Sequence, residues 1–258
     1  MITSTSNQRV KDLVALQKKS KIRSTEQSFL VEGIKMLREV PKDRLTRLYV
    51  SETFHKNNIA QMKDLGRVTD ILSDTVFSYI SDTKTPQGIL GVVRMSECSL
   101  DAIYAKAEGA FYLLLEGIQD PGNLGTILRT AEAAGVSGII MNRDCVDIYN
   151  PKVIRSTMGS IFRVPFVYVD RLSDVLEHCK KIGITSFAAD LRGSVPYSTQ
   201  DYTRGTALLI GNESKGLTEE LSDQADVRIH IPMLGKVESL NAAMAATILS
   251  FEVMRQRM

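Results

Sequence analysis

Residues Leu113–Gly135, LLLEGIQDPGNLGTILRTAEAAG, decide the fold that we expect for this chain. The stretch begins in an apolar run of strand length, Phe111–Leu115, and passes through a turn rich in Gly and Pro. It continues as helix-favouring sequence that ends at Gly135. A strand, a turn and a helix in this order place Asn123 and Arg129 near the carboxyl end of the strand. Ligands bind at that edge of open α/β sheets, so we expect a binding site there.

Two later stretches repeat this pattern of an apolar run followed by a polar loop. They are Leu208–Gly216, LLIGNESKG, and Ile229–Asn241, IHIPMLGKVESLN. Three such strand ends predict one shared pocket that is rich in backbone amides. This pocket suits a polar ligand and a phosphate better than nucleophilic catalysis, because an Arg offers a fixed positive fork and does not ordinarily act as a base. Its polar side chains are Asn123, Arg129, Asn212, Glu213, Ser239 and Asn241.

The composition is that of a globular protein. At 258 residues the chain can hold one large domain or two ordinary ones, and it is 43% hydrophobic and 24% charged, with a net charge of +2. The first residues lack the apolar core of a signal peptide. No uncharged apolar run approaches the roughly 20 residues that a membrane span needs. We therefore expect a cytoplasmic protein that does not enter a membrane.

Several common kinds of site find no support in the sequence. The cysteines at positions 98, 145 and 179 are odd in number and widely spaced, which favours buried free thiols over disulfides. His55, His178 and His230 are far apart and have no Cys or acid at ligand spacing, so we expect no metal site. The chain has no dinucleotide-binding G-x-G-x-x-G after a strand, no P-loop and no G-x-S-x-G hydrolase elbow.

The alternation of short elements predicts two domains. Residues 1–95 read as a small α/β domain, in which Glu52–Leu65 is one of the predicted helices. Residues 96–107 have mixed polarity without a clear period and are predicted to be a linker. Residues 108–258 alternate more plainly and predict a second α/β domain. From the residues alone we expect an ordinary doubly wound sheet there, because true knots are exceptional.

The last predicted helix spans Leu240–Met258, and Ser239 is its predicted cap. The helix is apolar or small on nearly every side through Ala246, and a helix of this kind must be buried by something. The Ala pairs at positions 242–243 and 245–246 permit close helix packing. Its packing partner is therefore either the rest of this chain or a second copy of it.

A predicted helix near the N-terminus concentrates positive charge. Ser6 or Asn7 can cap it, and Val10 and Leu13 begin its apolar stripe. The other face and the residues that follow carry six Lys or Arg against a single acid, Asp12. This is either a solvated helix face or a surface that contacts phosphates, and the clustering in a nearly neutral chain favours the second. The six residues are Arg9, Lys11, Lys18, Lys19, Lys21 and Arg23.

Three segments, in order and properly spaced, resemble the three motifs of the SpoU (TrmH) branch of the SPOUT RNA methyltransferases. They are NLGTILRT, IGNESKG and IPMLGKVESLNAAMA, and together they span the second domain. In the first domain, TEQSFLVEG at Thr25–Gly33 resembles the small substrate-binding domain found in many of these enzymes. That domain is similar in fold to ribosomal proteins L30 and L7Ae.

The resemblance implies a fold, a reaction and partners. The fold is a small N-terminal α/β RNA-binding domain followed by a C-terminal SPOUT α/β domain with a mostly parallel sheet and a trefoil knot. The implied reaction transfers a methyl group from S-adenosylmethionine to a ribose 2′-hydroxyl of structured RNA. Ribosomal (23S) RNA is the preferred substrate because the appended domain resembles a ribosomal protein, and tRNA is the nearest alternative. A homodimer formed through the catalytic domain is implied as well.

The resemblance also implies roles for individual residues. Arg129 matches the Arg that is held to assist deprotonation of the 2′-hydroxyl, and we favour stabilisation of the forming alkoxide and a clamp on the adjacent phosphate over a role as base. Arg155, in NPKVIRSTMGS, resembles a stretch that faces RNA or the dimer mate. The other catalytic positions are Asn123, Glu213, Ser239 and Asn241. The cofactor-binding positions are Leu209, Ile210, Gly211, Asn212, Ile231, Met233 and Leu240.

Two functions from other classes stay open. A ribosome-associated binding module would keep the fold without turnover, although the intact catalytic positions argue against it. A small-molecule α/β enzyme lacks a nucleotide fingerprint and leaves the basic helix unexplained, and a steep loss of RNA affinity with salt would separate it from the others. Taken singly, Asn123 and Ser239 could be helix caps and Glu213 a loop carboxylate. Their joint occurrence favours the site.

Overall fold

The computed structural model describes residues 1–62, 65, 68–105 and 109–258. They divide into two units: unit 1 comprises Met1–Glu97 and Asp147–Phe162, and unit 2 comprises Cys98–Val146 and Arg163–Met258. Residues 147–162 thus fold with the N-terminal part although they lie far along the chain. The domain boundaries predicted from the sequence stay predictions. Residues 106–108, where the predicted linker meets the second domain, lie outside the described residues.

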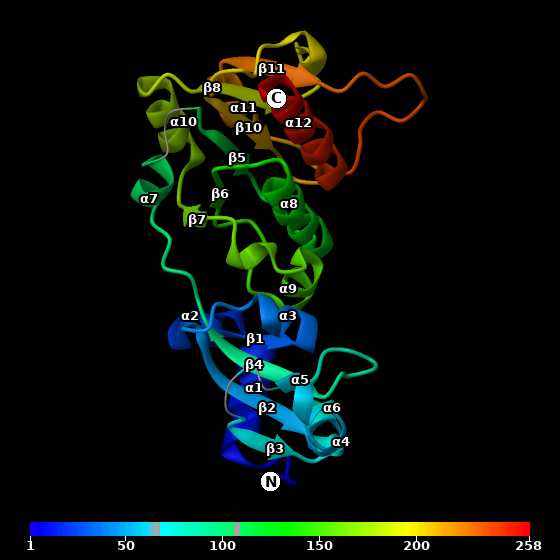
Figure 1. Cartoon of the computed structure of the whole chain (residues 1–258). Coiled ribbons are helices and arrows are strands. Elements are labelled where there is room, and N and C mark those ends of the chain that lie inside the picture. Colours follow the sequence, from blue (N-terminus) through cyan, green and yellow to red (C-terminus); the bar gives the residue numbers. More distant parts are fainter. Residues whose placement is uncertain (63–64, 66–67, 106–108) are drawn as a thin grey trace. The chain divides into compact units, whose positions relative to one another are not determined.

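In its described residues, unit 1 contains a four-stranded sheet in the order β1-β4-β2-β3 (Figure 1). β4 lies antiparallel to both β1 and β2, and β3 runs parallel to β2. The first elements are α1 (Gln8–Lys18), α2 (Ser20–Glu26), β1 (Ser28–Glu32), α3 (Ile34–Glu39), β2 (Leu45–Ser51), α4 (Glu52–Asn57) and α5 (Ile59–Met62). They are followed by β3 (Asp70–Leu72), α6 (Asp74–Ile80), β4 (Ile89–Arg94), α9 (Pro151–Thr157) and the 3-10 helix η1 (Ser160–Phe162).

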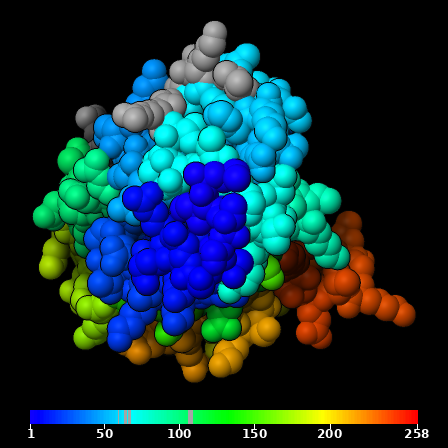
Figure 2. Space-filling model, turned by 90° about the horizontal axis from the view of Figure 1, so that it is seen from below, coloured from blue at the N-terminus to red at the C-terminus, as the bar shows by residue number. Residues whose placement is uncertain are grey.

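Helix α1 forms where the sequence predicts a helix. Asn7 caps it by accepting a hydrogen bond from the Arg9 backbone N–H. Val10, Leu13 and Leu16 are buried and pack with residues of α6 and the sheet. The polar side of α1 stays in solvent, and Figure 2 shows the N-terminal residues, in dark blue, as an exposed face. The basic residues on that side are therefore accessible.

Arg23 departs from the sequence prediction of a phosphate-contacting residue. Its side chain is 4% exposed, and its guanidinium pairs with the Asp147 carboxylate and donates to the carbonyl oxygens of Leu16 and Gln17. This guanidinium is buried and hydrogen-bonded within unit 1, so it offers little surface to a phosphate, and its predicted contact with RNA stays a prediction. It instead joins α2 to the 147–162 segment of unit 1, a structural role that sequence clustering could not reveal.

In its described residues, unit 2 contains a seven-stranded sheet in the order β7-β6-β5-β10-β8-β11-β9, and each neighbouring pair is parallel. Its first elements are α7 (Leu100–Tyr104), β5 (Phe111–Leu115), α8 (Pro121–Ala133), β6 (Gly138–Asn142), β7 (Phe166–Val169), α10 (Leu172–Lys181) and β8 (Thr185–Ala189). The later elements are β9 (Val195–Pro196), η2 (Tyr197–Thr199), β10 (Thr206–Ile210), α11 (Glu219–Gln224), β11 (Val227–His230) and α12 (Ala242–Arg257).

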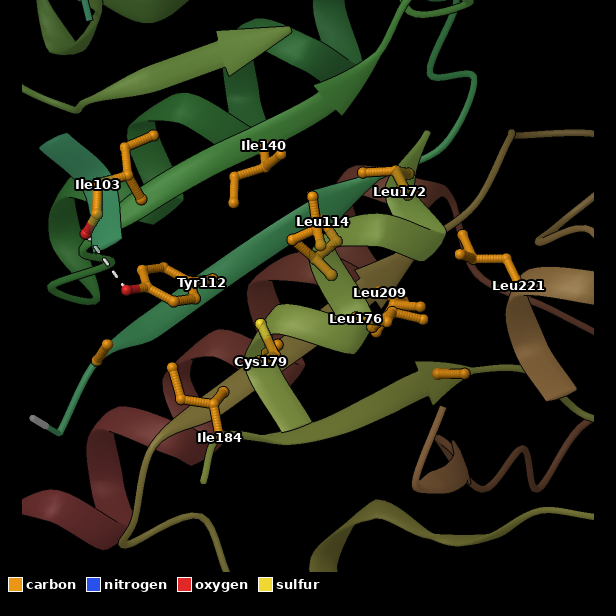
Figure 3. Packing of buried hydrophobic residues seen from close by; sticks show 14 of the residues in the cluster. Ile103, Tyr112, Leu114, Ile140, Leu172, Leu176, Cys179, Ile184, Leu209 and Leu221 are labelled. Atoms are coloured by element: carbon orange, nitrogen blue, oxygen red, sulfur yellow. Dashed lines mark hydrogen bonds between the residues drawn. The ribbon is translucent and has the colours of Figure 1, made fainter. Parts of the chain in front are cut away.

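Strands β5 and β10 form the centre of this sheet and are buried along their whole lengths. Such continuously apolar strands are typical of parallel sheets that are covered on both faces. Helix α10 packs against one face, where Leu176 and Cys179 meet Leu114 and Leu209 (Figure 3). Helices α8 and α12 lie side by side (Figure 1). This packing fixes the carboxyl ends of the strands, where the predicted site residues lie.

Three predicted elements differ in detail from the structure. The helix predicted over Glu52–Leu65 is divided into α4 and α5 at Asn58, and positions 63 and 64 lie outside the described residues. The predicted linker contains the short helix α7. The predicted cap Ser239 is wrong: α12 begins after Asn241, whose side chain accepts from the backbone N–H groups of Ala243 and Met244. The predicted knot stays a prediction.

Candidate active site

A pocket of about 420 Å³ opens where three neighbouring strands of unit 2 end. Its walls come from the residues that follow β8, β10 and β11 and from the start of α12. Carboxyl ends of parallel strands are where α/β proteins place ligands, because loops from several strands converge at that edge. The predicted cofactor-binding residues that line the pocket are Ile210, Gly211, Asn212, Ile231, Met233 and Leu240. Leu209 is instead buried in the hydrophobic core.

Gly211 allows the loop after β10 to fold back on itself. A Cβ atom at this position would lie 2.2 Å from the backbone of Gly216 and Leu217, a distance that no side chain tolerates. The loop is closed by reciprocal backbone hydrogen bonds between Asn212 and Gly216. Any larger residue at position 211 would push this wall apart, so the sequence requires Gly at the strand end.

Glu213 connects this loop to the first motif. Its carboxylate accepts hydrogen bonds from the backbone N–H groups of Gln119 and Asp120 and from the side-chain amide of Asn123, at 3.0 to 3.2 Å. Burial by itself raises the pKa of Glu213, but these hydrogen bonds outweigh it and hold the pKa below its ordinary value. Glu213 is thus held as a carboxylate that fixes the turn before α8.

Asn241 extends the connection to the third motif. Its side-chain amide donates to the Asn123 Oδ1 atom at 2.9 Å, while its own oxygen caps α12. Asn123 is not the cap of α8, because Asp120 fills that position and accepts from the Asn123 backbone N–H at 2.8 Å. One hydrogen-bonded chain, Glu213 to Asn123 to Asn241, therefore joins the three predicted motifs.

Arg129 and Ser239 lie outside this chain of hydrogen bonds. Arg129 is exposed on α8, and no described residue accepts a hydrogen bond from its guanidinium. It lies six residues beyond Asn123, which corresponds to roughly 9 Å along a helix. Ser239 is exposed and lines the pocket within the segment 231–241, which extends away from the rest of unit 2 (Figure 1). Both side chains are free to contact a bound substrate.

The structure adds residues to the pocket that the sequence analysis did not select. Asp190, Leu191 and Arg192 follow β8 directly, and His230 ends β11 with its Nδ1 atom 2.8 Å from the Ser194 hydroxyl. The rule that strand ends carry sites could have found them, because the sequence predicts a strand over Thr185–Asp190. They were missed because ADLRG contains no pattern associated with a known chemistry.

The predicted RNA-binding residues lie on unit 1. Arg155, on α9, is half-buried and pairs with Asp82 at 2.9 Å. Arg9 is exposed and pairs with Asp70. The exposed lysines of this set are Lys11, Lys18, Lys19 and Lys21. Among the residues that the structure describes, no group of three or more His, Cys, Asp or Glu side chains is arranged to hold a metal ion, and no helix is long and apolar enough to cross a membrane.

Comparison with known proteins relates both parts of the chain to RNA-modifying enzymes. Residues 110–251 match the model of the SpoU rRNA Methylase family, and residues 7–91 match the MRM3-like substrate binding domain. The chain is 35% identical over 254 residues to the 23S rRNA (guanosine(2553)-2′-O)-methyltransferase RlmP of Bacillus subtilis, and the match covers 98% of each.

Two solved structures are similar over nearly the whole chain. An AdoMet-bound rRNA methyltransferase from Sinorhizobium meliloti matches with a TM-score of 0.86 and 35% identity, covering 100% of this chain and 98% of the other. The SpoU methyltransferase AviRb from Streptomyces viridochromogenes, in complex with AdoMet, matches with a TM-score of 0.87 and 29% identity, covering 97% and 98%. The predicted fold class, α/β with a mostly parallel sheet in the larger part, is confirmed.

Proposed function

The chain belongs to the SpoU rRNA methylase family, and from this membership we propose that it transfers a methyl group from S-adenosylmethionine to a ribose 2′-hydroxyl of 23S rRNA. The observation that carries the proposal is the hydrogen-bonded chain from Glu213 through Asn123 to Asn241 beside the pocket. Ribosomal RNA is favoured over tRNA because the full-length relative RlmP is named for methylation of 23S rRNA. We place this reaction in the cytoplasm.

The pocket suits S-adenosylmethionine in size and lining. Ile210, Ile231 and Leu240 supply apolar surface, and the loop held closed by Gly211 presents backbone groups to a polar ligand. Sites for small cofactors are concave and combine apolar surface with placed polar groups, and the lining of this pocket combines both. When bound, S-adenosylmethionine supplies an activated methyl group on a sulfonium. The protein must hold the acceptor hydroxyl in line with it.

Arg129 is the residue that we propose to act on the acceptor. A ribose hydroxyl is a weak nucleophile at neutral pH, so stabilisation of the oxygen as it loses its proton speeds the reaction. The guanidinium is exposed, and its planar arrangement of N–H donors suits a phosphate oxygen or a forming alkoxide. Asn123 and Asn241 hold the starts of α8 and α12 together.

We propose that the enzyme is a homodimer formed through α12. Met244, Ile248 and Phe251 form an apolar stripe at helical spacing, and Met244 and Phe251 are 56% and 40% exposed. An exposed apolar stripe of this kind is typical of a protein–protein contact. We infer that a second copy of the chain packs against it and covers this side of the final helix. A monomeric mass at micromolar concentration, measured by light scattering, would contradict the dimer.

The substrate assignment is tested by methyl incorporation into RNA from cells that lack this gene. We expect label from S-adenosylmethionine in 23S rRNA, in a form that resists alkali because the 2′-oxygen is blocked. Isolated 23S rRNA and assembly intermediates should be tested beside purified tRNA. Label that appears in tRNA alone would overturn the choice of substrate, and cofactor binding without transfer to any RNA would favour a binding module.

The exposed basic residues of α1 and α2 are proposed to contact RNA phosphates. Replacing Lys18, Lys19 and Lys21 together by Ala should weaken RNA binding and reduce the slope of log affinity against log salt by about 0.7 to 0.9 for each phosphate that the variant no longer neutralises. The measurement is a salt titration of RNA affinity. Replacing Lys180 and Lys181 at the end of α10, in unit 2, by Ala provides a control with exposed lysines outside α1 and α2. An unchanged slope in the α1–α2 variant would place the RNA elsewhere.

A further inference from the structure

Asp190 is a buried carboxylate at the pocket that the proposed reaction does not use. Its side chain is 9% exposed and accepts four hydrogen bonds, three from Arg192 and one from the Ser222 hydroxyl. Burial by itself raises the pKa of Asp190, but the hydrogen bonds from Arg192 and Ser222 outweigh it and hold the pKa at about 2. The carboxylate is therefore charged at every physiological pH, and its acceptor capacity is taken up within the protein.

This carboxylate fixes the direction of Arg192. The Asp190 Oδ1 atom accepts from the Arg192 backbone N–H at 3.0 Å and from Nε at 3.1 Å, and Oδ2 accepts from Nη2 at 2.7 Å. A guanidinium that is hydrogen-bonded at Nε and Nη2 keeps a single orientation, so its side chain loses little conformational entropy when it binds a ligand. Its side chain is still 54% exposed, and no described residue accepts a hydrogen bond from Nη1.

Arg192 lines the same pocket as Gly211, Ile231 and Leu240. Lys215 lines it too, but an ammonium on a flexible side chain is a less selective anion site than a guanidinium held in one orientation. S-adenosylmethionine carries one anionic group at neutral pH, the carboxylate of its methionine part, and its other charges are positive. A planar carboxylate matches the geometry of a guanidinium.

We propose that Arg192, positioned by Asp190, binds the methionine carboxylate of the cofactor. The inference rests on the proposed function, because it takes S-adenosylmethionine as the ligand of this pocket. It makes Arg192 a cofactor-binding residue and Asp190 its positioning residue. An RNA phosphate is the other anion that an exposed Arg can meet, but the position of Arg192 in the wall of the pocket favours the ligand that the pocket encloses.

The test compares two ligands that differ at the carboxylate. S-adenosylhomocysteine carries the amino-acid part, whereas 5′-methylthioadenosine has the same nucleoside and thioether without it. By calorimetry on the full-length protein, we expect Arg192→Ala to raise the Kd of S-adenosylhomocysteine about tenfold and to leave that of 5′-methylthioadenosine unchanged. Arg192→Lys keeps the positive charge but loses the planar pair of N–H donors, and it should raise the Kd of S-adenosylhomocysteine about threefold.

Asp190→Asn provides a second variant, and it should weaken S-adenosylhomocysteine alone. Arg171→Ala is the matched control, because Arg171 is an exposed Arg of unit 2 paired with Asp174 outside this pocket. Equal losses for both ligands, or no loss for either, would overturn the inference. A loss of RNA affinity with both ligands unaffected would overturn it in favour of a phosphate contact. If the wild-type protein bound neither ligand, the proposed function itself would fail, and the inference with it.

Discussion

Replacing Arg129 with Ala is expected to lower the rate of methyl transfer by about 10²- to 10³-fold and to leave the affinity for S-adenosylmethionine within about twofold. A rate loss of this size is typical when a hydrogen-bond donor that stabilises charge in the transition state is removed. Arg129 is exposed, is not held by a described acidic partner and lies apart from the pocket lining, so its removal should disturb neither the fold nor cofactor binding. Arg129→Lys should recover little, because an ammonium lacks the planar fork.

Single-turnover kinetics and calorimetry on the same preparations separate the two effects. Arg143→Ala is the matched control: Arg143 is an exposed Arg of unit 2 that pairs with Asp170, and its loss should leave both quantities unchanged. A collapse of cofactor affinity in Arg129→Ala would mean that Arg129 supports the pocket rather than the reaction. A loss smaller than about threefold would remove Arg129 from the mechanism.

The sequence predicted the strand ends well because each combines two local signals. Phe111–Leu115 and Thr206–Ile210 are buried throughout, and polar residues follow each of them closely. A continuous apolar run is typical of a buried parallel strand, and polar residues directly after it are typical of a ligand site at the carboxyl end of that strand. The family resemblance then indicated which polar residues act together. The structure adds how they do so, through the hydrogen bonds of Asn123 with Glu213 and Asn241.

The failures have a common cause, which is that identical residue types serve different roles in different environments. Arg23 occurs in a run of basic residues, and nothing in that run distinguishes a buried guanidinium from a solvated one. Ser239 and Asn241 are both good helix caps, and tertiary packing places the start of α12 after the second. Asp190 and Arg192 become candidate site residues only because they form an ion pair, and no spacing rule for sequences predicts that pair. The partner of a charged side chain can therefore be identified only from the folded structure.

Replacing Glu213 with Gln should impair both the reaction and the pocket, because one carboxylate accepts from two N–H groups of the 119–120 turn and from the Asn123 amide of the first motif. A Gln side chain keeps one oxygen acceptor, but its NH₂ group then opposes either the Gln119 N–H or the Asp120 N–H together with the Asn123 amide. That opposition should displace Asn123 and, through it, Asn241. We expect methyl transfer to fall by about 10²-fold, since small misplacements of positioning groups have effects of this size. Glu177→Gln, at an exposed position on α10, is the matched control.

The difference in stability between the wild type and the Glu213→Gln variant should depend on pH with a predictable sign. The pKa of Glu213 is lower in the folded protein than the ordinary value of 4.5, so its carboxylate stabilises the fold above that value and the contribution is lost as pH falls through the folded pKa. The difference in unfolding free energy between wild type and variant should therefore be present at neutral pH and shrink below the ordinary glutamate pKa. Denaturant unfolding at neutral and acidic pH measures it. A difference that stayed constant, or grew on acidification, would mean that Glu213 does not hold the turn before α8 as a charged acceptor.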